Sequence, residues 1–285
     1  MPSTHRVDAG PLTLVAYDWG GDGDPVLLAH ATGFHGRVWE PVANRLVAAG
    51  RRVWSFDFRG HGDSDRPPDL DFRWEGFADD VLAVVDAFGL AGDPRLLAAG
   101  HSKGAAALLL AEQARTGALA RIWAYEPIVI PTEEPGDPQP DFPLAVSARR
   151  RRAEWASPEE ALASYGSRPP FDVLHADALR AYVDHGLRRR DDGSFELTCL
   201  PNDEASTYAM QFAHSAYRHL EDVRCPTVVA CGEDTDAIPP KLAAMIAERL
   251  PDARLEVMPG LGHFGPIQDP DAAVASMRAF ADVRG

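Results

Sequence analysis

The sequence has few cysteines, few positive charges and no long hydrophobic run. Only three of its 285 residues are cysteines, and they show neither CxxC nor metal-ligand spacing: Cys199, Cys225 and Cys231. An odd number of cysteines in this arrangement indicates neither a disulfide framework nor a zinc site. No other motif indicates a metal or a cofactor, and we expect none.

Positive charge is scarce, because 28 Lys and Arg residues stand against 43 Asp and Glu residues. The formal net charge of −15 repels phosphate backbones and anionic lipid, so neither nucleic acid nor a membrane surface is an expected partner. The first residues lack the apolar core of a secretory signal, and no segment approaches about 18 consecutive apolar residues. We therefore expect a cytoplasmic protein.

Apolar runs alternate with amphipathic stretches in both halves of the chain, which is typical of an α/β fold. In the first half we expect strands and helices in turn at Val26–His30, Val38–Ala49, Arg52–Asp57, Trp74–Leu90, Leu96–Gly100 and Ala105–Arg115. The alternation returns at Thr227–Cys231, Pro240–Leu250, Arg254–Met258 and Asp271–Asp282. Strands that are apolar on both faces, each followed by a helix, predict a mostly parallel sheet flanked by helices.

The alternation breaks between about Pro131 and Asp222. This part opens with the proline-rich stretch PTEEPGDPQPDFP, which forms neither a helix nor a central strand. Helical patterns then follow at Arg149–Trp155, Pro158–Tyr165 and Ala176–Gly186. We expect a first core part at 1–131, a mostly helical insertion at 132–222 and a second core part at 223–285, and we favour this over an independent second domain.

The sharpest local signal is Gly100-His101-Ser102-Lys103-Gly104, where an apolar strand runs into a helix. In a nucleophile elbow the turn is so tight that the residues two before and two after the serine must be small, and the hydroxyl is held at the sheet edge. We interpret Ser102 as a nucleophile. Lys103 would donate its backbone N–H to an oxyanion, and its side chain is expected to face solvent.

A serine nucleophile needs a base, which is itself held by a carboxylate. His263 follows the last predicted strand and is the expected base. For the acid we prefer Asp236, which follows the strand Thr227–Cys231, while Asp234 and Glu126 stay as alternatives near the same sheet edge. The second oxyanion donor is expected in the loop after Val26–His30, with Thr32, Gly33 and Phe34 as candidates.

With these motifs the chain resembles the α/β-hydrolase superfamily: HATGFHGRVW, DFRGHGDSD, GHSKG, GEDTD and the late GHF all have counterparts there. Two details depart from the usual pattern. His30-Ala31 replaces His-Gly, and Asp236 lies four residues after Gly232 where the family usually has its acid three residues after. The resemblance implies that 132–222 forms a cap over the site.

The resemblance and the triad predict a serine hydrolase that cleaves a carboxylic ester or a related acyl compound through an acyl-enzyme. A carbon–carbon bond hydrolase with the same triad is one alternative, and a ligand-binding or biosynthetic member without hydrolysis is another. We expect a small-molecule substrate with an apolar acyl group. Its contacts are predicted at Phe34 and Trp39 in the core and at Tyr208 and Phe212 late in the insertion.

Overall fold

The computed structural model describes residues 1–282 and is built around an eight-stranded sheet in the order β1-β2-β4-β3-β5-β6-β10-β11. The strands are β1 Ser3–Asp8, β2 Thr13–Gly20, β3 Pro25–Ala29, β4 Arg52–Asp57, β5 Leu97–His101, β6 Arg121–Tyr125, β10 Thr227–Gly232 and β11 Ala253–Met258. From β4 to β11 all neighbouring strands are parallel, which confirms the predicted α/β fold class. Only β1 and β2, which the sequence analysis did not identify, add to the sheet in antiparallel fashion.

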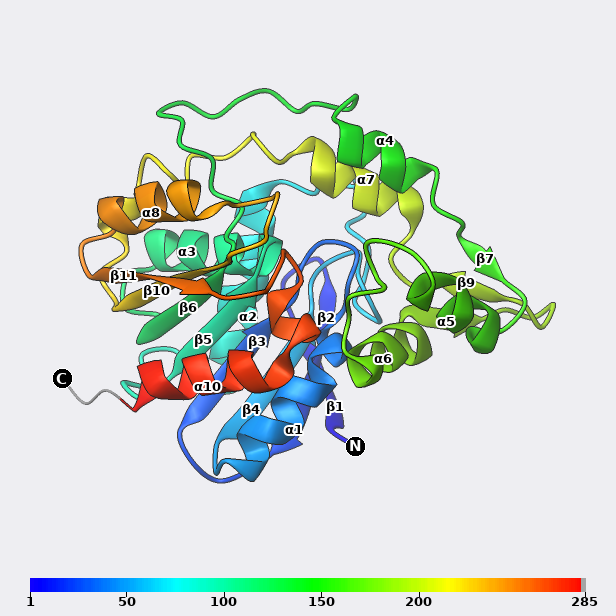
Figure 1. The fold of residues 1–285 in the computed structure, drawn as a ribbon, viewed down its shortest axis with the longest axis horizontal. Coiled ribbons are helices and arrows are strands. Elements are labelled where there is room, and N and C mark those ends of the chain that lie inside the picture. Colours follow the sequence, from blue (N-terminus) through cyan, green and yellow to red (C-terminus); the bar gives the residue numbers. More distant parts are fainter. Residues whose placement is uncertain (283–285) are drawn as a thin grey trace.

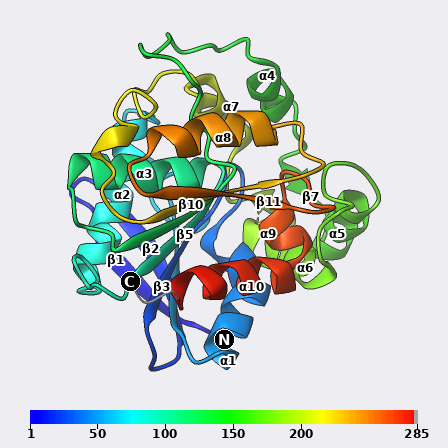
Figure 2. The same ribbon diagram turned by 60° about the vertical axis from the view of Figure 1, so that its left-hand side comes forward.

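Helices cover both faces of the sheet. Figure 2 shows α1 (Glu40–Ala48) and α10 (Pro270–Ala281) on one face, and α2 (Trp74–Ala87), α3 (Lys103–Ala114) and α8 (Pro240–Arg249) on the other. Strand β3 illustrates why the sequence contains continuous apolar runs. Its residues Val26 and Leu28 belong to the buried cluster on one face of the sheet, and Leu27 and Ala29 belong to the buried cluster on the other face. Both faces of a central parallel strand are therefore removed from water.

The segment between β6 and β10 carries its own elements beside the main sheet (Figure 1). These are α4 Pro143–Arg149, β7 Glu154–Trp155, α5 Pro158–Gly166, α6 Ala176–Gly186, β8 Leu187–Arg189, β9 Phe195–Leu197, α7 Pro201–Ala209 and the 3-10 helix η2 Leu220–Asp222. The predicted helices at α5 and α6 are confirmed. The helix expected at Arg149–Trp155 is wrong, because Trp155 pairs with Phe195 in a small three-stranded sheet, a non-local pairing that overrides local propensity.

Polar contacts fasten this segment to the core. Asp203, at the start of α7, is buried and accepts a hydrogen bond from Arg66 Nε at 2.5 Å. The indole N–H of Trp74 donates to the backbone oxygen of Met210 at 2.7 Å. Helix α7 is therefore held in a defined place above the core. Among residues 1–282, no helix is long and apolar enough to cross a membrane.

Candidate active site

Ser102 lies on a sharp turn between the end of β5 at His101 and the start of α3 at Lys103. Its backbone has φ 56 and ψ −116, a left-handed conformation that is rare outside glycine. A Cβ atom on Gly100 would lie 2.6 Å from Ala105 N, and one on Gly104 would lie 2.3 Å from Ala29 O. The two glycines are therefore required by close backbone approach, which is the geometry expected of a nucleophile elbow.

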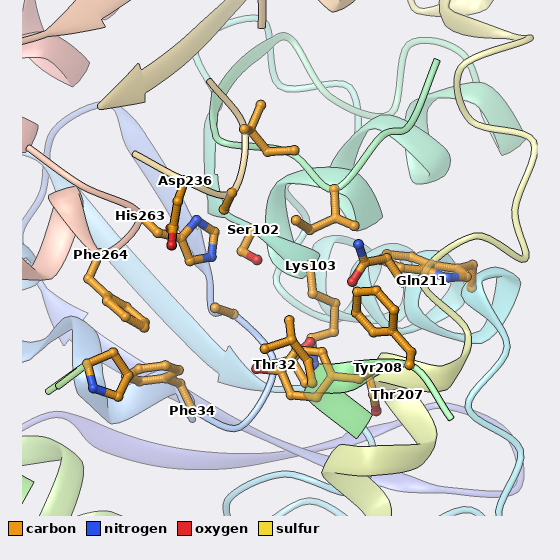
Figure 3. A pocket seen from close by; sticks show the side chains of 18 residues that line it. Thr32, Phe34, Ser102, Lys103, Thr207, Tyr208, Gln211, Asp236, His263 and Phe264 are labelled. Atoms are coloured by element: carbon orange, nitrogen blue, oxygen red, sulfur yellow. The ribbon is translucent and has the colours of Figure 1, made fainter. Parts of the chain in front are cut away.

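His263 is paired with Glu126, one of the two alternative acids. The Nδ1 atom of His263 lies 2.6 Å from Oε2 of Glu126, whose side chain is fully buried. Figure 3 shows the His263 ring turned toward the Ser102 side chain. When a carboxylate holds an imidazole at Nδ1, the other ring nitrogen, Nε2, is left to accept a proton from a nucleophile, as in the base of a triad.

The carboxylate paired with His263 is therefore not Asp236, the acid that the sequence analysis prefers. Asp236 is exposed and lines the cavity beside His263, but no hydrogen bond joins it to another residue within 1–282, and Asp234 is exposed as well. Glu126 reaches the histidine because it follows β6, which lies between β5 and β10 in the sheet. Its left-handed backbone, with φ 46, belongs to a tight turn at the strand end.

Three hydrogen bonds hold the loop that carries His263. His101 Nε2–H donates to the backbone oxygen of His263 at 2.8 Å, and the Tyr125 hydroxyl donates to the oxygen of Gly262 at 2.7 Å. The Gly262 N–H donates to the side-chain oxygen of Gln268 at 3.1 Å. These three bonds hold the glycine-rich loop around His263 in a defined position. Burial lowers the pKa of His101 well below its usual value, so His101 acts here as a neutral donor.

The loop after β3 borders the same cavity. Thr32 and Phe34 line it together with Ser102. Gly33 has φ 78, and a Cβ atom on it would lie 2.6 Å from Oε1 of Glu204. The Phe34 N–H already donates to Ala31 O at 3.3 Å. Neither Thr32 nor Gly33 has a backbone N–H bond to another residue within 1–282, but of these two only Thr32 lines the cavity, so its amide is the better placed candidate.

Comparison with known proteins agrees with this fold. A model described as "Alpha/beta hydrolase family" matches residues 26–277. The chain belongs to the alpha/beta hydrolase family. Its relatives include RutD of Caulobacter sp. (strain K31), whose name proposes carbamate hydrolysis, with 25% identity over 97% of this chain and 94% of that protein. A non-heme chloroperoxidase of Streptomyces lividans is 28% identical over 86% and 87% of the two chains.

Solved structures show the same fold. The crystal structure of E-2-(acetamidomethylene)succinate hydrolase superimposes with a TM-score of 0.82, covers 99% of this chain and 100% of its own, and is 22% identical. At that identity the likeness concerns the fold alone. The functional residues of this alpha/beta hydrolase must therefore be argued from its own geometry.

The side chain of Lys103 does not face solvent, contrary to the sequence-based expectation. It is fully buried, with Nζ 3.4 Å from His61 Nε2 and 4.3 and 4.6 Å from the ring centres of Phe58 and Phe77. No carboxylate oxygen within residues 1–282 lies within 4.0 Å of it. The start of α3 is covered by the loop after β4 and by α2, so there is no path to water. Burial lowers the pKa of Lys103 to about 7.

A cavity of about 430 Å³ opens over Ser102 (Figure 3), and most of its wall is apolar. Phe34 and Tyr208 line it as predicted. Trp39 does not, because it is buried in the core at the start of α1, and Phe212 packs instead on Phe142 with ring centres 5.5 Å apart. Residues that the sequence analysis missed also line the cavity: Trp74, Ile128, Phe142, Leu144, Thr207, Gln211 and Phe264.

The buried Lys103 predicts a pH dependence of stability. Above about pH 7 the folded protein releases a proton that the unfolded chain keeps up to about pH 10.4, so this group makes unfolding less favourable as the pH rises through that window. We expect the free energy of unfolding of the wild type, relative to Lys103→Met, to increase between about pH 7 and 10. Urea titrations at several pH values measure it. Lys241→Met, at an exposed lysine in α8, is the matched control and should give a flat difference.

Proposed function

We propose that this alpha/beta hydrolase cleaves a carboxylic ester or a related acyl compound, with Ser102 as nucleophile, His263 as base and Glu126 as acid. The observation that carries the proposal is the 2.6 Å contact of Glu126 with His263 Nδ1, next to a serine on a strained elbow. Both Ser102 and His263 line the same cavity. A serine hydroxyl becomes a useful nucleophile only beside such a base.

The proposed reaction has two half-reactions. His263 Nε2 accepts the Ser102 proton while Oγ attacks the acyl carbon, and Glu126 stabilises the imidazolium through Nδ1–H. The backbone N–H groups of Lys103 and Thr32 would hold the oxyanion. The imidazolium then gives its proton to the leaving alkoxide, which departs as the alcohol. In the second half, His263 deprotonates a water that attacks the acyl-enzyme, and the proton returns to Ser102 as the acid is released.

We further propose that 132–222 acts as a cap that selects a small apolar acyl group. Thr207, Tyr208 and Gln211, in and just after α7, line the cavity over Ser102, and α7 is held to the core through Asp203 and Met210. Apolar walls with a few polar groups are typical of small-molecule sites. In this proposal the core supplies the chemistry and the cap supplies selectivity.

Replacing the nucleophile tests the mechanism directly. Ser102→Ala should lower kcat for p-nitrophenyl esters by roughly a thousandfold or more, because neither the attack nor the acyl-enzyme is possible without the hydroxyl. The wild type should be labelled covalently by a serine-directed phosphonate, as measured by mass spectrometry, and the variant should not. Retention of more than about a tenth of the activity would rule out the serine mechanism.

The identity of the acid is tested by three amide substitutions. Glu126→Gln should lower kcat roughly 10³- to 10⁴-fold, since an amide supports the wrong histidine tautomer and leaves the imidazolium unpaired. Asp236→Asn should cost much less, because Asp236 lies on the cavity wall without a bond to His263. Asp234→Asn, at an exposed site outside the cavity, is the control. If Asp236→Asn is the most damaging of the three, the acid lies after β10.

Acyl selectivity is tested in the cap. Burying one methylene group contributes about 0.8 kcal/mol, so activity should change about fourfold per carbon until the cavity is full. Tyr208→Ala enlarges the cavity and should shift the preferred ester to longer chains, with a small effect on kcat for the best substrate. Phe212→Ala removes a neighbouring aromatic side chain outside the cavity wall and should leave the profile unchanged. Identical profiles for the wild type and both variants would place acyl binding elsewhere.

A further inference from the structure

The buried carboxylate of Glu126 has more partners than His263 alone. Its Oε1 atom accepts the backbone N–H of Gly232 at 3.0 Å, and its Oε2 atom accepts the hydroxyl of Thr235 at 2.8 Å. Both donors come from β10 and the loop after it, whereas Glu126 itself follows β6. The acid is therefore held in place by a loop that does not carry it.

The Thr235 hydroxyl has a defined orientation. Its oxygen accepts the backbone N–H of Ala237 at 3.2 Å, while its proton is donated to Glu126 Oε2. The same Oε2 atom is the one that lies 2.6 Å from His263 Nδ1. A hydroxyl whose lone pair is already engaged is a directed donor, and a bond to a charged acceptor is stronger than one between neutral groups.

The position of Thr235 in the chain is informative too. It lies three residues after Gly232, where the resemblance to the α/β-hydrolases expects the acid, and Asp236 lies one residue further on. This loop thus approaches the histidine pair in the expected place but offers a hydroxyl in place of a carboxylate. Thr235 thus donates a hydrogen bond to Glu126, the carboxylate that reaches His263 from the end of β6.

We infer that Thr235 is a positioning residue of the hydrolase: its hydroxyl fixes the Glu126 carboxylate and tunes the basicity of His263. The inference rests on the proposed function. Without the donor, the carboxylate loses one partner, its negative charge is less dispersed, and the imidazolium beside it is stabilised more strongly. The carboxylate is also free to leave the orientation that suits Nδ1, which slows proton transfer.

The test compares Thr235→Val and Thr235→Ser with Thr227→Val. Thr227 lies at the start of β10, whereas Thr235 lies in the loop after the end of that strand. Thr227 is buried and donates its hydroxyl to Cys225 O at 3.1 Å, so Thr227→Val makes the same chemical change away from the site. Thr235→Val should lower kcat about three- to tenfold with little change in KM, the loss expected for one hydrogen bond. Thr235→Ser should retain activity within about twofold, since it keeps the hydroxyl. Thr227→Val should leave kcat unchanged, and circular dichroism checks that all variants are folded.

Two further readouts distinguish positioning from a general structural role. The acid limb of the kcat/KM profile, which reports the base of the free enzyme, should move to higher pH in Thr235→Val and stay in place in Thr227→Val. In the Glu126→Gln background, Thr235→Val should have a much smaller effect than in the wild type, because the two residues act through one carboxylate.

An unmoved acid limb, or an equal loss from Thr235→Val in both backgrounds, would overturn the inference. So would kcat values for Thr235→Val that match those for Thr227→Val. If Glu126→Gln is strongly damaging while Thr235→Val is silent, only this inference fails. If Ser102→Ala or Glu126→Gln keeps activity, it is the proposed function that fails.

Discussion

The site depends on one steric constraint, the turn that carries Ser102 from β5 into α3. The backbone there is left-handed, and Gly100 and Gly104 lie so close to neighbouring backbone that no side chain fits. The close approach of Gly104 to Ala29 brings the start of α3 against the end of β3. The loop after β3, with Thr32 in it, is thereby brought to the same cavity as the serine. A strained residue of this kind persists only where packing on all sides determines it.

The second determinant is the order of the strands. Because β6 lies between β5 and β10, the ends of three neighbouring strands meet at one edge of the sheet, and the loop after β11 joins them. Glu126 follows β6, its two anchoring donors come from β10 and the loop after it, and His263 lies in the loop after β11. Chain segments far apart in sequence thus combine into one hydrogen-bonded unit, as is general for sites at the carboxyl ends of parallel strands.

Buried ionisable side chains are the third feature. Lys103 lies between two aromatic rings and a neutral histidine, since burial lowers the pKa of His61 well below its usual value. In the segment between β6 and β10, Arg151 pairs with Glu204, next to the loop after β3. Burying a charge costs desolvation energy that packing alone would avoid.

The sequence by itself determined the sheet-and-helix alternation, the elbow and the histidine, because each is written in local patterns: apolar runs on both strand faces, glycines flanking a serine, and a histidine after the last strand. It also brought Glu126 forward as an alternative acid but ranked Asp236 above it, because the place of Asp236 after the strand Thr227–Cys231 was the available criterion. The pairing of His263 with Glu126, the donor role of Thr235 and the burial of Lys103 were decided by the tertiary structure. Each of these depends on which strands are neighbours and on what covers the start of α3, and such contacts join residues far apart in the sequence, where no local pattern records them.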